Sequence, residues 1–235
     1  MFKRVFDIFF SLLGLVIFSP VLIIFMILIY LQDKHSPFYI APRVGLNGKL
    51  FNMIKLRSMV VDADKTGVDS TADTDNRITK IGHLVRKYKL DELTQLINVL
   101  KGDMSFVGPR PNVLREIKKY TEEEQKLLTI KPGITDFASI VFSDEGSILA
   151  NKQDPDLAYN QLIRPWKSQL GILYIRNQSF LLDIKLIILT IISFISKNKV
   201  LYLLNIELKK ITNNQKLIDV CKRNGKMEYE INQFY

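Results

Sequence analysis

Two adjacent carboxylates, Asp91 and Glu92, are the residues of this 235-residue chain that are best placed to do chemistry. Apolar residues recur with helical spacing from Leu90 to Leu100, and Lys101-Gly102 forms a helix stop, so the pair is expected in the first turn of a helix. The helix dipole and the free N–H groups there favour carboxylate anions. Because neighbouring helical residues point about 100° apart, we expect two separate roles rather than a shared proton.

Basic residues surround this pair in the sequence. Arg86, Lys87 and Lys89 precede it, and Gly108-Pro109-Arg110-Pro111 follows the helix. The two prolines restrict the backbone around Arg110, which lowers the entropy lost when its guanidinium binds an anion. The segment is either a well-capped amphipathic helix or an ionised nucleophile or metal ligand beside several phosphate-binding cations.

A β-hairpin is predicted upstream, with strands at 38–44 and 50–59. The connection contains Asn47-Gly48, a pair that supplies the positive φ angles of tight hairpin turns. On the second strand, a period of 2 places Lys55 and Arg57 on one face about 7 Å apart, a spacing that fits two oxygens of a diphosphate. A solvated strand face is the other interpretation of this pair.

The loop from Asp62 to Asp75 is rich in aspartate. It contains two Asp-x-Asp pairs, the first formed by Asp62 and Asp64, which suggest the metal-diphosphate motif of nucleotide-sugar glycosyltransferases. Those enzymes place a nucleotide-binding α/β half before the motif, and only about 25 residues lie between the apolar N-terminal segment and the motif here, so a solvated acidic loop is favoured.

Composition limits the classes of partner. The chain has one Cys, and its two His lie 48 positions apart, so a disulfide framework and a protein-built zinc centre are excluded. With 33 Lys and Arg against 24 Asp and Glu, the net charge is +9, which indicates an anionic partner, either nucleic acid or a phospholipid surface. The apolar N-terminal end favours the membrane over nucleic acid.

That apolar end is long enough to cross a bilayer. Between Val5 and Leu31 the single charged residue is Asp7, and Pro20 must kink or break a helix there because it has no N–H for the carbonyl of Val16. Ser19 can lend its hydroxyl to that carbonyl. Positive charges flank both ends, so a spanning helix and a re-entrant helix that turns at Ser19-Pro20 both remain open.

A second apolar stretch occupies residues 180–196. Its polar residues share slightly less than half of the helical wheel, and they are Asp183, Lys185, Thr190, Ser193 and Ser196. We expect a helix lying in the membrane interface, with a buried core helix as the alternative. Together these patterns predict an α+β protein, mostly helical with a short hairpin, divided into a membrane helix at 1–34, a catalytic domain at 35–197 and a helical extension at 198–235.

Five ordered blocks give the chain a family resemblance. They are Arg-Val-Gly-x-x-Gly-Lys-x-Phe (43–51), Lys-x-Arg-Ser-Met (55–59), Leu-Asp-Glu-Leu through Val-Gly-Pro-Arg-Pro (90–111), Lys-Pro-Gly-Ile-Thr (131–135) and Ser-Phe-Leu-Leu-Asp-Ile-Lys (179–185). The chain resembles the bacterial sugar transferase family, the small monotopic transferases that move a hexose 1-phosphate onto a polyprenol phosphate. The resemblance runs from about residue 2 to residue 196.

The resemblance implies transfer of a sugar 1-phosphate from a UDP-sugar to undecaprenyl phosphate with release of UMP. This is the first membrane step of O-antigen, capsule or glycoprotein glycan assembly, followed by downstream glycosyltransferases. The family pattern makes Asp91 the nucleophile that forms a phosphosugar-aspartyl intermediate, and Glu92 a metal ligand or an aid to the lipid phosphate. The positions that match basic residues around the phosphates are Lys55, Arg57, Arg86 and Arg110.

The family also implies Mg2+, held by Asp91 and Glu92, and a re-entrant membrane helix broken at Ser19 and Pro20. It places the protein in the bacterial inner membrane with the catalytic domain on the cytoplasmic face. Two departures from the family pattern put the identity of the donor in doubt: the run after Pro132-Gly133-Ile134-Thr135, and Gly171 at an expected acidic position. Asp136, Asp144 and Glu145 are candidate replacements, and Gly171 is the main argument for a catalytically silent scaffold.

Overall fold

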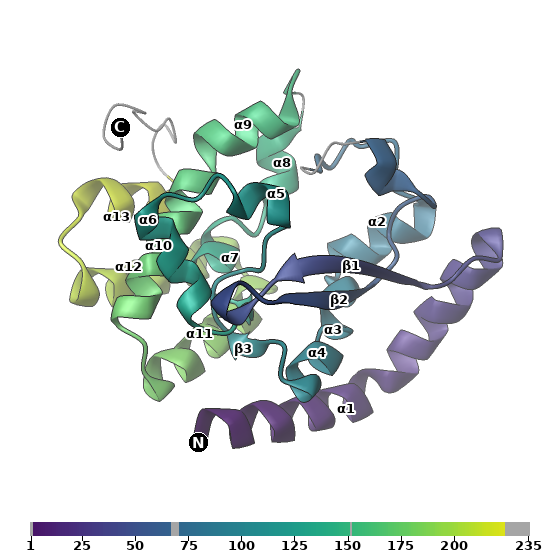
Figure 1. Ribbon diagram of the computed structural model, residues 1–235, viewed down its shortest axis with the longest axis horizontal. Helices are drawn as coiled ribbons and strands as arrows, with labels where there is room; N and C mark the ends of the chain where they lie inside the picture. Colours follow the sequence, from purple (N-terminus) through teal and green to yellow (C-terminus); the bar gives the residue numbers. More distant parts are fainter. Residues whose placement is uncertain (1, 67–70, 151, 224–235) are drawn as a thin grey trace.

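The computed structural model describes residues 2–66, 71–150 and 152–223. Within these ranges the chain is mostly helical and carries two small two-stranded sheets, so the expected α+β class is confirmed (Figure 1). Asp69 of the acidic loop and residues 224–235 of the predicted extension lie outside the described residues.

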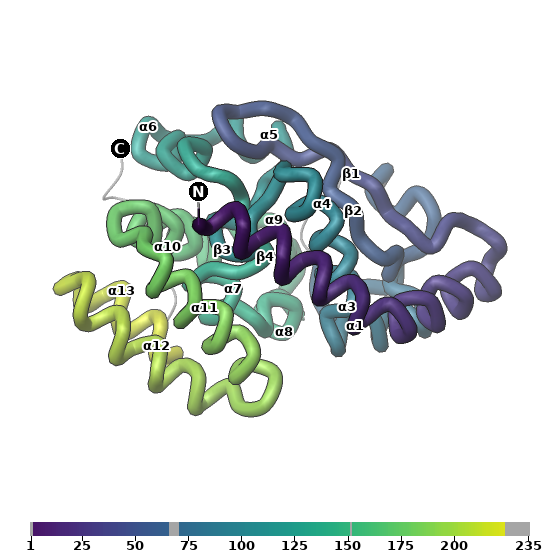
Figure 2. The backbone as a smooth tube through the Cα atoms, turned by 90° about the horizontal axis from the view of Figure 1, so that it is seen from below, coloured from purple at the N-terminus to yellow at the C-terminus, as the bar shows by residue number. Residues whose placement is uncertain are grey.

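Helix α1 runs from Phe2 to Asp33 with Pro20 inside it. The Ser19 hydroxyl donates to the carbonyl of Val16 at 2.8 Å, which confirms the expected compensation for the missing proline N–H. Because that carbonyl is satisfied, the helical backbone continues through Pro20 rather than breaking, and α1 changes direction along its length (Figures 1 and 2). The interruption expected at Pro20 is therefore a bend within one helix.

One side of α1 packs along the rest of the protein (Figure 2). Near its start, Lys3 forms an ion pair with Asp183 at 2.5 Å, and the Arg4 guanidinium donates to the carbonyls of Val99 and Leu100. Farther along, α1 buries Leu22 and Ile29. Most of its other large apolar side chains are exposed, and α1 is the one helix of the described ranges that is long and apolar enough to cross a membrane.

The predicted hairpin is present, formed by strands β1 (Phe38–Val44) and β2 (Leu50–Leu56) around the short 3-10 turn η1 (Leu46–Gly48). Asn47 and Gly48 adopt φ angles of 54° and 75°, as the turn type requires. Strand β2 ends at Leu56, three residues before the predicted end at Met59. The segment after it leads through η2 (Ala63–Thr66) to helix α2 (Lys80–Lys87).

The helix expected after Leu90 occurs as two short pieces, α3 (Leu90–Leu93) and α4 (Leu96–Lys101). Its stop is confirmed, because Gly102 takes a φ of 94° and its N–H bonds to the carbonyl of Asn98. The interruption lies at Thr94, whose hydroxyl donates to the carbonyls of Asp91 and Ile54 at 3.0 and 3.1 Å. These two hydrogen bonds connect the end of α3 to strand β2, and so they fix the position of the carboxylate pair relative to that strand.

A second sheet, absent from the sequence prediction, consists of the parallel strands β3 (Ser105–Val107) and β4 (Gly133–Thr135). It depends on two glycines. A Cβ on Gly133 would lie 2.1 Å from the backbone nitrogen of Gly108, and a Cβ on Gly108 would lie 2.4 Å from the carbonyl of Lys131. The Gly-Pro-Arg-Pro and Lys-Pro-Gly-Ile-Thr segments can therefore pass in direct contact only because both positions lack a side chain.

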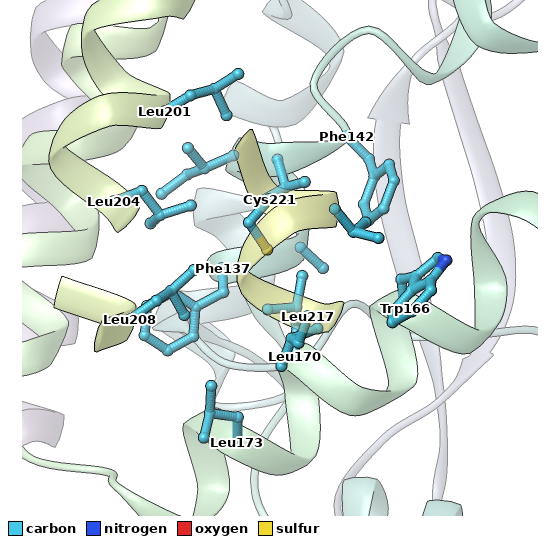
Figure 3. Close-up of a cluster of buried hydrophobic side chains, with 14 of the residues drawn as sticks. Phe137, Phe142, Trp166, Leu170, Leu173, Leu201, Leu204, Leu208, Leu217 and Cys221 are labelled. Atoms are coloured by element: carbon cyan, nitrogen blue, oxygen red, sulfur yellow. The ribbon is translucent and has the colours of Figure 1, made fainter. Parts of the chain in front are cut away.

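Helices from the second half of the chain enclose the largest apolar core. The elements there are α5 (Leu114–Ile117), α6 (Glu122–Gln125), η3 (Lys126–Thr129), α7 (Phe137–Val141), α8 (Glu145–Leu149), α9 (Pro155–Leu162), α10 (Arg164–Arg176), α11 (Phe180–Ser193), α12 (Lys197–Ile211) and α13 (Gln215–Lys222). Figure 3 shows side chains of α12 and α13, among them Leu204 and Cys221, packed against Phe137 of α7. The described part of the C-terminal extension is thus helical and completes this core.

Helix α11, the second apolar stretch, has one face buried in the core and another apolar face that is exposed. Leu182, Leu186 and Leu189 are buried in the core, whereas Leu181 and Ile191 are 66% and 59% exposed. The polar side points into the protein: the Asp183 carboxylate accepts from Tyr174 at 2.5 Å and from Lys3. One apolar face of α11 is therefore left uncovered, and α1 reaches it through the contact between the rings of Phe6 and Phe180, whose centroids are 5.4 Å apart.

Candidate active site

The carboxylate pair opens onto a cavity of about 540 Å3. The lining residues come from strands β1 and β2, from helices α2 and α3, from the Pro-restricted segment after β3 and helix α5, and from the region of α7 to α10. The lining side chains that can carry charge are Arg43, Lys55, Asp73, Arg86, Lys89, Asp91, Glu92, Arg110, Arg115, Glu116, Lys119, Glu145, Asp156, Tyr159 and Lys167. A polar cavity of this kind suits a charged ligand with several hydrogen-bonding groups.

Asp91 and Glu92 lie in the first turn of α3, as predicted, and each faces a different cation. The Lys55 Nζ is 3.5 Å from Asp91 Oδ2, and the Arg110 Nη2 is 3.0 Å from Glu92 Oε1. Burial alone would favour protonated Glu92, but the positive charges of Arg110, Lys89 and Lys55 together hold its pKa below the ordinary value. Both acids therefore have distinct electrostatic partners, which fits two separate roles.

Lys55 occupies its position because β2 is fixed to the helix that carries the acids. The Ile54 N–H donates to the Asn98 side chain at 2.9 Å, and the Ile54 carbonyl accepts from Thr94 at 3.1 Å. Burial lowers the pKa of the Lys55 ammonium, and the nearby Asp91 carboxylate acts in the opposite direction. The ammonium is thus presented to the cavity on a rigid strand rather than on a loop.

Arg110 is fixed by the contact between the two glycine-containing segments. Its Nη1 donates to the carbonyl of Ile134 at 2.8 Å, while its Nη2 faces Glu92. The Gly108 N–H bonds to the carbonyl of Thr135, and the Gly133 N–H bonds to the carbonyl of Pro109. The two prolines and these backbone hydrogen bonds restrict the conformations open to the Arg110 guanidinium. Less conformational entropy is therefore lost when it binds an anion.

Arg86 and Arg57 have different surroundings. Arg86 lines the cavity from α2, with its Nε donating to the Ser58 hydroxyl at 3.1 Å. Arg57 does not line the cavity: it is 7% exposed and binds both oxygens of Asp33, at 2.5 and 2.7 Å, and the carbonyl of Ser36. The alternation that would place it beside Lys55 ends with β2 at Leu56, so Arg57 joins the hairpin to the end of α1 instead.

Several cavity residues were not singled out by the sequence. Arg43 belongs to the first family block without an expected role, and Lys167 forms an ion pair with Glu145, the one of the candidate replacements that lines the cavity. Burial alone would lower the pKa of the Lys167 ammonium, but Tyr159 and Glu145 raise it above the ordinary value. Glu145, Tyr159 and Lys167 come from α8, α9 and α10, and no local sequence signal predicts that these helices line the same cavity as the hairpin.

Of the residues that depart from the family pattern, some line the cavity and others do not. Gly171 is buried on α10 beside Leu127 and does not line the cavity. Asp136 caps α7 by accepting from the Ser139 N–H at 2.6 Å, so its carboxylate is engaged with the backbone. Glu145 does line the cavity. Because Gly171 lies outside the cavity, the lack of an acidic side chain at this position is no argument for a catalytically silent scaffold.

The acidic loop contributes little to this cavity. Asp62 and Asp64 do not line it, and Asp62 forms an exposed ion pair with Lys65 at 2.9 Å. Asp73 does line it, and accepts from the Ser147 hydroxyl at 2.6 Å. Among the described residues, no group of three or more His, Cys, Asp or Glu side chains could hold a metal ion. A metal ion in this cavity would therefore need ligands from a substrate as well.

The chain belongs to the bacterial sugar transferase family, whose model matches residues 1–197. A Bacillus subtilis protein provisionally named an undecaprenyl-phosphate N-acetylgalactosaminyl 1-phosphate transferase is 47% identical over 133 residues, which is 57% of this chain and 70% of that protein. An uncharacterized sugar transferase of the same bacterium is 37% identical over 80% of this chain and 85% of its own length.

A longer relative is the UDP-glucose:undecaprenyl-phosphate glucose-1-phosphate transferase of Klebsiella pneumoniae. It is 34% identical over 201 residues, which cover 84% of this chain but 41% of the Klebsiella protein. The chain thus spans most of the two shorter relatives and less than half of this longer one.

Replacing each of two neighbouring cations separates a role in the cavity from a role in stability. We expect Lys55→Gln to lower turnover roughly 100-fold with an unchanged melting temperature, because a fixed positive charge beside Asp91 is lost. Arg57→Gln should instead cost about 2 kcal/mol of stability, because Asp33 loses a bidentate partner. Thermal unfolding and initial rates of both purified variants test this. Loss of turnover in fully folded Arg57→Gln would restore the predicted phosphate role of Arg57.

Proposed function

We propose that this protein transfers a sugar 1-phosphate from a UDP-sugar to undecaprenyl phosphate and releases UMP. Family membership and the names of the relatives support the class of reaction. The observation that carries the proposal is the cavity itself, in which Lys55, Arg86 and Arg110 surround two carboxylates at the start of a helix. Phosphoryl transfer depends mainly on positioning and charge neutralisation, and this arrangement supplies both.

Asp91 is the proposed nucleophile. Its carboxylate oxygen attacks the β-phosphorus of the UDP-sugar, a bond forms between that oxygen and the phosphorus, and the bond from the phosphorus to the bridging oxygen breaks, so that UMP leaves with the bonding electrons. A phosphate oxygen of undecaprenyl phosphate then attacks the same phosphorus and releases the Asp91 carboxylate. Donor and acceptor thus use one site in turn, and no proton has to be abstracted from Asp91.

Glu92 has a separate role in this scheme, because Arg110 rather than Lys55 is its partner. The lowered pKa of Glu92 keeps it ionised, so it can bind a cation or orient the incoming lipid phosphate without acting as an acid. Lys55, on β2, stabilises the negative charge that passes between Asp91 and the phosphoryl group. Arg86 and Arg110 are placed to bind the remaining phosphate oxygens.

The residues present fit the expected Mg2+. This ion prefers oxygen ligands and is commonly held by one or two carboxylates together with substrate phosphates, and Asp91 and Glu92 both face the cavity. When bound, Mg2+ would supply further neutralisation of the diphosphate charge. The absence of a larger ligand cluster among the described residues agrees with a site that is completed by the substrate.

We further propose a re-entrant placement of α1 in the inner membrane, with the catalytic domain on the cytoplasmic face. The two ends of a spanning helix lie on opposite sides of a bilayer. Both ends of α1 contact the same body here, since Lys3 binds Asp183 near the start and Asp33 binds Arg57 at the end. The exposed apolar side chains of α1 and α11 would then enter the headgroup region together, at the depth of the acceptor phosphate.

The alternative of a glycosyltransferase acting through Asp62 and Asp64 has no support from the cavity, because neither residue lines it. The expected product distinguishes the two activities, since a glycosyltransferase of that kind releases UDP.

An aspartate series tests the proposed chemistry. With a UDP-sugar, Mg2+ and undecaprenyl phosphate, the parent should release UMP. In Asp91→Asn the rate of UMP release should fall at least about 1,000-fold, because the nucleophile is removed while the shape of the side chain is kept. The double variant of Asp62→Asn and Asp64→Asn is the matched control and should retain parental turnover. Chromatographic identification of the nucleotide is the measurement. Release of UDP, or substantial turnover by Asp91→Asn, would contradict the proposal.

Topology has its own test. Single cysteines placed by Phe2→Cys and Ser36→Cys should react with a membrane-impermeant thiol reagent from the same face of sealed inverted vesicles, because α1 returns to the side it entered. In a Pro20→Leu background they should move to opposite faces as the helix straightens. Cys221 is buried, and burial raises its pKa to about 12, so it contributes little background. Labelling of the parental pair from opposite faces would exclude the re-entrant placement.

A further inference from the structure

The C-terminal helices lie almost wholly beyond the family match, which ends at residue 197. They are nevertheless an integral part of the fold, because Val200, Leu204 and Leu208 of α12 and Cys221 of α13 are fully buried. Two basic residues bracket this pair of helices: Lys197 at the first position of α12 and Arg223 directly after α13. Both point back toward the catalytic domain.

Lys197 and Arg223 converge on one carboxylate, that of Asp144. Lys197 forms an ion pair with Asp144 Oδ2, and the Arg223 Nη2 lies 3.3 Å from the same oxygen. The Arg223 guanidinium also lies 5.8 Å from the centre of the Phe142 ring. Figure 3 shows that ring beside the turn of α13 that carries Cys221. The side chains of Asp144 and Arg223 are 31% and 17% exposed, so the contact is shielded in part from solvent.

Asp144 belongs to a wall segment of the cavity, defined here as residues 142–146. Its neighbours Phe142, Ser143, Glu145 and Gly146 all line the cavity. Other contacts hold the same segment from two further sides: the Asp73 N–H bonds to the carbonyl of Gly146 at 3.1 Å, and Glu145 pairs with Lys167. The position of the wall segment therefore depends on Asp73, on α10 and on the two C-terminal cations.

The wall segment differs in chemistry from the side that carries the proposed phosphate machinery. Lys55, Arg86 and Arg110 lie on the Asp91 side, whereas the wall segment contributes Ser143 and Glu145 to the cavity lining, and its Phe142 ring is buried in the core beneath them. Hydroxyl and carboxylate groups bind the hydroxyl groups of a sugar or ribose. The wall segment is also where the chain departs from the family pattern, so its own supports need not be those of the family.

We propose that the C-terminal helices position the wall segment for the UDP-sugar donor, with Asp144, Lys197 and Arg223 as positioning residues. This inference rests on the proposed function for the identity of the ligand. Breaking the contact shifts groups that touch the sugar or the nucleoside and leaves Asp91, Lys55 and Arg110 in place. The expected effect is therefore on donor binding rather than on the phosphoryl-transfer step or on the lipid acceptor.

The test uses the full-length protein in detergent or nanodiscs. Asp144→Asn and Arg223→Gln should each raise the KM for the UDP-sugar by at least about tenfold, with kcat and the KM for undecaprenyl phosphate within twofold of the parent. Because Asp144→Asn already removes the ion pair that Arg223→Gln breaks, together with the one to Lys197, the double variant should be no worse than Asp144→Asn alone. Arg223→Lys, which keeps the charge, should recover most of the donor affinity.

Two lysines of the same helices serve as matched controls. Lys199 is exposed on α12, and Lys222 pairs with Asp219 at 2.6 Å on α13, away from the cavity. Lys199→Gln and Lys222→Gln remove the same charge and should leave the donor KM unchanged. Equal donor KM values in Arg223→Gln and in these controls would overturn the inference, and so would additive losses in the double variant of Asp144 and Arg223.

Hydrogen exchange separates failure of this inference from failure of the proposed function. Amides of residues 142–149 should exchange faster in Arg223→Gln than in the parent or in Lys222→Gln, and this measurement needs no substrate. Unchanged exchange would show that the C-terminal helices do not hold the wall segment. A parent that releases no UMP from any UDP-sugar would refute the proposed function, while the exchange result would still decide whether the contact with Asp144 fixes the wall segment.

Discussion

The structure depends on holding two carboxylates, Asp91 and Glu92, next to each other in one cavity, each beside a positive charge. Each carboxylate has a separate cation: Lys55 from a strand for Asp91, and Arg110 from a Pro-restricted segment for Glu92. Neither cation is close in sequence to its acid. The hairpin, the Thr94 hydrogen bonds and the glycine-dependent contact between two segments together bring these charges into one cavity.

The same body also carries an exposed apolar surface. Helix α1 keeps polar contacts at both ends and exposes apolar side chains between them, and α11 adds a second exposed apolar face next to it. An enzyme whose acceptor is anchored in lipid gains from this arrangement, because its nucleophile can be held at a fixed depth. In the proposed reaction a donor from the water phase would use the same cavity in an earlier step, so that one site serves both substrates in turn.

Local patterns predicted what depends on local structure. The helix start at Leu90 follows from the apolar periodicity, the helix stop at Gly102 and the turn at Asn47-Gly48 follow from φ preferences, and all were confirmed. Features that depend on distant partners were missed. The β3–β4 pair forms only because Gly108 and Gly133 allow their two backbone segments to come into contact. Arg57 pairs with Asp33, which lies 24 residues away in the sequence. The contribution of α12 and α13 to the core likewise follows from packing that no short motif encodes.

Mass spectrometry of the protein after exposure to donor alone tests the central claim most directly. With a UDP-sugar and Mg2+ but no undecaprenyl phosphate, we expect one equivalent of UMP and a mass increase of one hexose phosphate, located on the peptide that contains Asp91. Later addition of undecaprenyl phosphate should discharge it. An unmodified Asp91 peptide, under conditions where the complete mixture forms product, would contradict the account.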